Sequence, residues 1–169
     1  MKYAAIVMAL LVIAGAVLGI YTAANARIQI ESVSLAAASG EEKQTEFAKL
    51  QQAMDNGALI GTPFTETLTG NSSDYSFFTY TFRLKNGGLI DAAMVEIQPV
   101  PTNGDVLCYT SLDSSQAAAE LTVKAGKERD AWCVVLTSRQ NQEQHLVTRS
   151  FRITYYIWGV AKSTVVTYN

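Results

Sequence analysis

Residues that usually perform chemistry are scarce in this chain of 169 residues, which has one histidine and two cysteines. The histidine, His145, follows the polar run 139–144, which is typical of an exposed loop rather than of a catalytic base. The sequence has no C-x-x-C pair, no G-x-S-x-G elbow, no glycine-rich nucleotide loop and no D-x-D-x-D calcium loop. We therefore expect no metal site, no cofactor and no catalytic activity.

Clustered charge is also missing. The chain has 13 basic and 15 acidic residues, and Lys2 is the only charged residue before Arg27. The basic residues are scattered, whereas proteins that bind nucleic acid or anionic membranes concentrate them on one face. This charge pattern predicts that nucleic acid is not a partner.

One long run has no charge at all: residues 3–21 read YAAIVMALLVIAGAVLGIY. A helix of this length, with about 1.5 Å rise per residue, spans roughly the 30 Å hydrocarbon layer of a bilayer. Tyr3 and Tyr21 would lie at the two interfaces, where tyrosine is enriched. We predict a single-pass signal anchor over residues 1–26, which places residues 27–169 on the extracytoplasmic side of the cell membrane.

The same segment has a second interpretation as a cleaved signal peptide. Ala24-Asn25-Ala26 fits the small-residue pattern of signal peptidase, and cleavage after Ala26 would release a secreted domain. The apolar run exceeds the roughly 7–15 residues of an ordinary signal peptide, which favours the anchor. Gly15 and Gly19 form a G-x-x-x-G pair that can bring two membrane helices together, but such pairs are common and nothing else in the sequence indicates a dimer.

Residues 27–169 are predicted to form one domain that begins with a strand or a continuation of the helix and contains one short helix. That short helix covers about 41–55, because Ser39-x-x-Glu42 matches a capping box and Asn56-Gly57 is a typical helix end. Its narrow apolar face indicates that it covers a sheet, although such a helix could also bind a partner.

From residue 75 the apolar period changes to two, which is typical of strands. The turn sequence at 85–88, Lys-Asn-Gly-Gly, predicts a tight hairpin to a return strand at 89–100. Further strands are expected near 65–69, 106–111, 117–123 and 130–137, followed by a hairpin over 151–168. Seven or eight short strands with frequent turns predict a mainly β fold, an antiparallel β-sandwich.

Two stretches, FTYTFRLKNGGLIDAAMVEI and TVKAGKERDAW, resemble immunoglobulin-like sandwiches of the fibronectin type III and bacterial surface kinds. The resemblance implies an Ig-like fold and no particular function. The antibody pattern is absent, because Trp132 directly precedes Cys133 instead of lying between the two cysteines.

Cys108 and Cys133 both fall in strand-like segments. In an oxidising compartment they could form a disulfide that closes a loop of about 25 residues and stabilises the fold by roughly 3 kcal/mol. They could equally be two buried thiols that pack as small apolar side chains. The spacing does not choose between the two.

Aromatic residues occur on both faces of the predicted strands. Phe77, Tyr156 and Trp158 fall on the face opposite the expected core, where they could form a platform for a glycan, a peptide or a partner protein. The alternative, which we favour, is that the helix at 41–55 covers this face.

These patterns indicate a membrane-anchored extracytoplasmic module that binds or supports a partner protein. One alternative is a secreted module, released after Ala26, that binds glycan or cell wall through exposed aromatic residues. A hydrolase with paired carboxylates is a further alternative. The carboxylates that would serve it are Asp91, Glu96, Asp105, Glu128 and Asp130.

Overall fold

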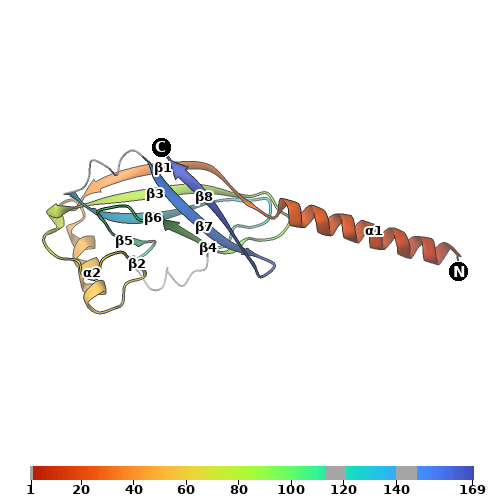
Figure 1. Ribbon diagram of the computed structural model, residues 1–169, viewed down its shortest axis with the longest axis horizontal. Coiled ribbons are helices and arrows are strands. Elements are labelled where there is room, and N and C mark those ends of the chain that lie inside the picture. The colour runs from red at the N-terminus through yellow and green to blue at the C-terminus, as the bar shows by residue number, and fades with distance from the viewer. Residues whose placement is uncertain (1, 113–120, 140–147) are drawn as a thin grey trace.

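A computed structural model describes residues 2–112, 121–139 and 148–169. It contains a long N-terminal helix, a short helix, one 3₁₀ turn and eight strands (Figure 1). In chain order these elements are α1 (Lys2–Asn25), β1 (Ile28–Ser39), α2 (Gln44–Asp55), β2 (Gly61–Pro63), η1 (Ser72–Asp74), β3 (Tyr75–Asn86), β4 (Ala93–Pro99), β5 (Asp105–Tyr109), β6 (Glu128–Ser138), β7 (Arg149–Ile157) and β8 (Val160–Tyr168).

The strands form two antiparallel sheets, which confirms the predicted mainly β sandwich. The larger sheet has the order β1-β3-β6-β5-β2 and the smaller has the order β4-β7-β8. If β2 is set aside and the other strands are lettered A to G along the chain, the sheets read A-B-E-D and C-F-G. This is the strand order of constant-type immunoglobulin domains.

Aromatic side chains fill the space between the sheets. The rings of Tyr80 and Phe82 on β3 lie 4.6 and 4.9 Å from the ring of Phe151 on β7. All three side chains are buried. The alternation predicted from residue 75 onward is therefore correct, with Phe78, Tyr80, Phe82 and Leu84 on the core side.

A second, smaller core lies beneath α2 on the outer face of the larger sheet. Phe47 and Leu50 of α2 pack there with Phe77 of β3, which is only 1 % exposed. Phe77 is thus not part of an exposed aromatic platform, and the alternative that the helix covers it is confirmed. The physical reason is that the apolar stripe of α2 needs an apolar partner surface.

Local sequence signals fix both ends of α2. Ser39 and Glu42 bond each other's backbone N–H reciprocally at 3.3 Å, as the capping-box pattern predicts, although the regular helix begins only at Gln44. At the other end, Gly57 adopts φ +63° and donates its N–H to Met54, while Ala58 donates to Ala53. This pair of bonds is a Schellman motif.

The predicted hairpin at 85–88 is wrong. β3 pairs with β1 and β6, whereas β4 pairs with β7 in the other sheet. The side chain of the buried Asn86 donates to the carbonyls of Ile90 and Val123 and accepts the N–H of Gly88. These bonds stabilise a connection that runs from β3 in the larger sheet to β4 in the smaller sheet, in place of a hairpin within one sheet.

Other boundaries differ less. No strand forms at 65–69, and the short strand β2 at Gly61–Pro63 pairs with β5 instead. In the segment predicted as a strand at 117–123, Val123 forms an isolated bridge with Ala92, while 117–120 lie outside the described residues. His145 and residues 140–144 also lie outside them.

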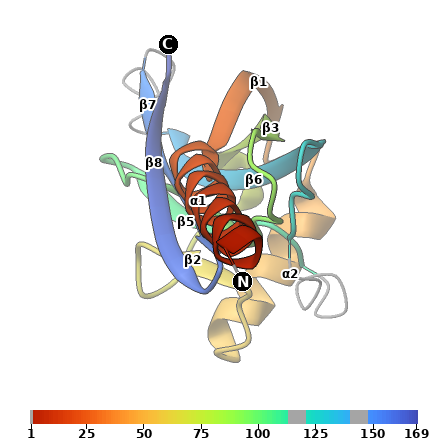
Figure 2. The ribbon, with the colours of Figure 1, turned by 90° about the vertical axis from the view of Figure 1, so that its right-hand side faces the viewer.

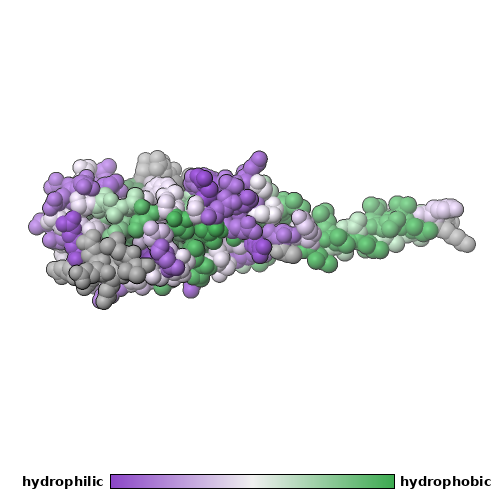
Figure 3. All heavy atoms as spheres, turned by 90° about the horizontal axis from the view of Figure 1, so that it is seen from above, coloured by the Kyte–Doolittle hydropathy of each residue, from purple (hydrophilic) through white to green (hydrophobic). Residues whose placement is uncertain are grey.

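The helix α1 projects from one end of the sandwich (Figures 1 and 2), and its window Tyr3–Thr22 is long and apolar enough to cross a membrane. Within that window only Thr22, at its end, is buried, so α1 is not a core helix. Figure 3 shows it as a mostly apolar rod beside a domain whose surface mixes polar and apolar residues. The sandwich begins directly after α1, because Ala26 and Ile28 are already buried.

Candidate functional site

The two outer faces of the sandwich differ. On the larger sheet α2 covers part of the outer face, whereas no described element covers the outer face of β4-β7-β8. The side chains on that face alternate with the buried core positions of the three strands. They are Met94, Glu96 and Gln98 of β4, Arg152, Thr154 and Tyr156 of β7, and Ala161, Ser163 and Val165 of β8.

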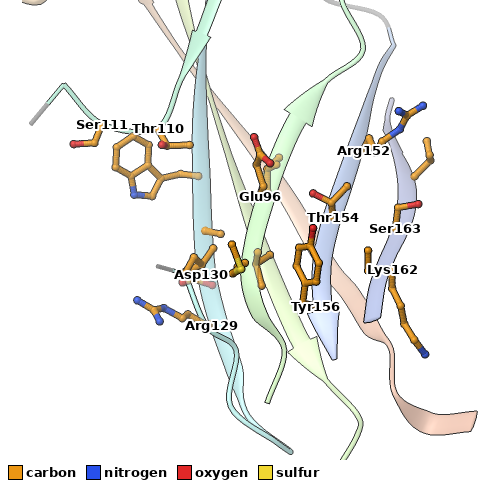
Figure 4. A pocket seen from close by; sticks show the side chains of 18 residues that line it. Glu96, Thr110, Ser111, Arg129, Asp130, Arg152, Thr154, Tyr156, Lys162 and Ser163 are labelled. Atoms are coloured by element: carbon orange, nitrogen blue, oxygen red, sulfur yellow. The ribbon is translucent and has the colours of Figure 1, made fainter. Parts of the chain in front are cut away.

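An open groove of about 1070 Å³ lies over this face and extends to the edge of β6. Figure 4 shows Glu96 of β4 beside Thr154 and Tyr156 of β7, with Arg129 and Asp130 of β6 on the other side of β4. The groove thus combines an uncovered sheet face with a second strand that belongs to the opposite sheet.

Two strand edges border this groove, and among the described residues one has no strand partner and the other is only partly paired. Within the described residues, positions 128–133 of β6 pair with β3 alone, and β4 pairs with β7 alone. Val95 of β4 donates its N–H away from β7, to the carbonyl of Leu121 at 2.8 Å. The backbone N–H and C=O of Ile97, two residues further along β4, point to the same side of the strand as those of Val95. No described strand pairs with them there. A smaller cavity of about 200 Å³ continues along this edge toward Tyr109.

Exposed apolar side chains mark the groove. Trp132 is 43 % exposed, Tyr156 39 % and Met94 55 %. Tyr156 was among the predicted surface residues, but sequence reasoning missed Trp132. Its neighbours Ala131 and Cys133 are buried, so strand alternation places the side chain of Trp132 on the outer side of the sheet. Alternation along this strand is the sequence signal that could have predicted the exposure of Trp132.

Most charges near the groove have partners. Arg83 makes two hydrogen bonds to Asp130, at 2.9 and 3.0 Å, and they hold the pKa of the Asp130 carboxyl below its usual value. Arg129 donates to the carbonyl of Thr122 at 2.8 Å. Arg152 remains on the open face.

The other candidate carboxylates also have local partners. Lys124 donates to Asp91 at 2.7 Å and lowers the pKa of that carboxyl. Glu128 lies 3.4 Å from the ammonium of Lys85, and Glu96 accepts a bond from the amide of Gln98.

Asp105 is the one candidate carboxylate with a buried partner. It accepts from Arg149 at 2.7 and 3.1 Å and from the backbone N–H of Thr102 at 2.8 Å. Since Asp105 begins β5 and Arg149 begins β7, this pair ties the two sheets together. The two side chains are 0 % and 1 % exposed, which indicates a structural role.

Cys108 and Cys133 are free, buried thiols in this structure, and a disulfide between them stays a prediction. Cys108 is opposite Val135 in the register of β5 and β6, so the two cysteines are diagonal neighbours. Diagonal Cα atoms lie roughly 7–8 Å apart, beyond the usual disulfide span of about 4.4–6.8 Å. A hydrogen bond to Cys108, together with burial, raises the pKa of the Cys133 thiol.

The remaining predicted surface residues do not meet at this groove. Trp158 lies in the turn between β7 and β8, outside the groove lining. Gly15 and Gly19 lie on the exposed surface of α1, where no other atom comes within 4 Å of an added Cβ. Their role in a dimer therefore stays a prediction.

The chain matches no protein-family model, and no curated protein matches it either. Within residues 2–112, 121–139 and 148–169, no group of three His, Cys, Asp or Glu side chains could hold a metal ion. The proposed function is therefore derived from the geometry of the groove.

Proposed function

We propose that this chain is a membrane-anchored module whose extracytoplasmic β-sandwich binds a partner protein in the groove beside β4. The observation that carries the proposal is the open groove of about 1070 Å³, with its exposed Trp132 and Tyr156, beside edges of β4 and β6 that lack a full strand partner among the described residues. A protein partner can use both features, since aromatic side chains anchor interfaces and free strand edges accept an added strand.

The shape of the groove favours a protein over a small ligand. Small-molecule sites usually enclose most of their ligand, whereas this groove is a broad sheet face open to solvent. Its lining mixes apolar side chains with charges of both signs, including Glu96 and Arg152. Protein interfaces have this composition, with an apolar centre and a polar rim.

The anchor rests on α1. Its apolar surface is exposed from Tyr3 to Tyr21, so a bilayer is the environment that satisfies it best. An N-terminal segment of this kind leaves its amino end in the cytoplasm, which puts the sandwich on the other side of the cell membrane.

We also propose that the sandwich is Ig-like. The order A-B-E-D and C-F-G supports this proposal, and β3 and β7 are the strands that an antibody disulfide would connect. Here Tyr80, Phe82 and Phe151 occupy that position as packed rings. The cysteines lie on β5 and β6 of one sheet instead.

The test is site-specific photocrosslinking of the full chain in its native membranes. A photoreactive benzoylphenylalanine at Thr154 should give one discrete protein adduct, and the same probe at Lys49 on the exposed side of α2 should give none. Trp132→Ala should abolish the adduct at Thr154, whereas Trp158→Ala, outside the groove, should leave it unchanged. Adducts that do not depend on probe position or on Trp132 would contradict the proposal.

The amino terminus of the mature chain distinguishes the anchor from the secreted alternative. An intact terminus in the membrane fraction supports the anchor. A new terminus at Arg27 in the medium would replace it with a secreted module, whose ligand would then be sought among glycans and cell-wall polymers.

A further inference from the structure

The turn between β7 and β8 has an unusual residue at its tip. Trp158 and Gly159 form a two-residue loop in which both have positive φ, +54° and +73°. Tight turns of this kind favour Asn-Gly or Gly-Gly, because a bulky side chain is strained in the left-handed region. The turn geometry therefore does not explain a tryptophan at this position.

Core packing does not explain it either. Trp158 is 64 % exposed, and its neighbour Val160 is 60 % exposed. Neither residue belongs to the core between the sheets or to the core beneath α2. A strained, exposed aromatic side chain is typical of a functional contact.

The position of the turn indicates what that contact is. Tyr155 accepts the backbone N–H of Ile28 at 3.2 Å, and its cross-strand partner Lys162 donates to the carbonyl of Ala26 at 2.8 Å. The β7–β8 hairpin is thus fixed to the point where the chain leaves α1. Trp158 lies three residues beyond Tyr155, or about 10 Å further along the hairpin.

The hairpin continues toward the membrane helix. Figures 1 and 2 show its turn at the end of the sandwich from which α1 projects. Leu89, 56 % exposed, belongs to the same end, because the adjacent Gly88 packs against Asn25 and Ala26. Exposed apolar side chains therefore gather around the base of α1.

We propose that Trp158 enters the lipid interface of the membrane in which α1 is anchored, with Val160 and Leu89 beside it. The membrane window ends at Thr22, so Ala26 lies about 6 Å past the hydrocarbon edge. The polar interface is itself roughly 5–7 Å thick on each side. The hairpin therefore reaches the depth at which tryptophan is enriched in membrane proteins.

This inference rests on the proposed anchor and adds a second attachment point to it. The proposed contact is with the interface of a zwitterionic bilayer, because tryptophan is enriched at the interface itself and does not require anionic head groups. At this end Lys124 bonds Asp91 and Lys162 bonds Ala26, while Arg27 and Lys127 are exposed. Two attachment points would limit rotation of the sandwich about its tether.

The chain has two tryptophans, and this permits a direct test. The variant Trp132→Phe keeps only Trp158, and Trp158→Phe keeps only Trp132. Each full-length variant is reconstituted into phosphatidylcholine vesicles with and without brominated acyl chains, which quench nearby tryptophan. Trp158 should lose most of its emission to the brominated lipid and shift to shorter wavelength, whereas Trp132 should change little.

Flotation of the same vesicles separates the two proposals. If the protein floats with the vesicles but Trp158 is no more quenched than Trp132, the proposed interfacial contact is wrong. The proposed membrane anchor is then still supported. Protein that does not float would overturn the anchor, and the contact with it. Unchanged thermal transitions for both variants would show that quenching compares two folded proteins.

Discussion

The buried ion pair between Arg149 and Asp105 offers the sharpest test of how the sandwich is held together. Their closest atoms, Arg149 Nη2 and Asp105 Oδ1, are 2.7 Å apart, and the side chains are essentially inaccessible to solvent. Asp105 also accepts bonds from Thr102 and Thr137, so its carboxylate is committed to one geometry. We predict that Arg149→Met strongly destabilises the domain.

The size of the effect follows from burial. Removal of one partner leaves the carboxylate of Asp105 buried without its countercharge, which costs about 3–5 kcal/mol. A domain of this size is stable by about 5–15 kcal/mol, so the loss is a large fraction of the total. Since 1 kcal/mol shifts the melting temperature by about 3–5 °C at this length, Tm should fall by about 10–20 °C.

The assay is thermal unfolding of the full chain in mild detergent, followed by near-ultraviolet circular dichroism. Arg83→Met is the matched control, because it breaks the exposed bridge to Asp130, where screening by solvent leaves little net stabilisation. Asp105→Asn combined with Arg149→Met should recover much of the loss, with a coupling energy of about 1–3 kcal/mol. Equal effects of Arg149→Met and Arg83→Met would refute the reasoning.

Three further predictions concern the rest of the fold. Burial and the bond to Glu46 raise the pKa of Tyr109 in the folded protein. The stability that the neutral Tyr109 contributes is therefore complete below about pH 10 and is lost as the pH rises further. In unfolding measured as a function of pH, Tyr109→Phe should reduce this loss of stability at alkaline pH. Leu50→Ala should cost about 2–5 kcal/mol in thermal unfolding, because Leu50 is fully buried, and a smaller cost would mean that α2 packs loosely. Cys108 and Cys133 should react with a thiol reagent only after denaturation, whereas an absence of reactive thiol in denaturant would indicate a disulfide.

Much of the local structure could be predicted because its signals are local. The alternation that begins at residue 75 placed Tyr80 and Phe82 on the core side, and the hairpin β7–β8 followed from the same period. The glycine at 57 fixed the end of α2 through its own positive φ. Each of these features depends on a few neighbouring residues.

The candidate site could be predicted only in part. Tyr156 was recognised, but Trp132 entered the groove because β6 extends past the end of β5, where no other described strand pairs with it. Phe77 has the same alternation signal as an exposed residue, yet α2 covers it. Alternation tells which face a side chain occupies and not what lies over that face.

The apolar helix, the strand periodicity and the mainly β class can all be predicted from the sequence, because length, hydropathy and period are properties of contiguous residues. The folded chain was needed to learn that β3 and β4 lie in different sheets, that Asp105 pairs with Arg149 and that a groove forms beside β4. These features join residues that are far apart in the chain. They depend on which strands pair and how two sheets stack, and no local pattern encodes either.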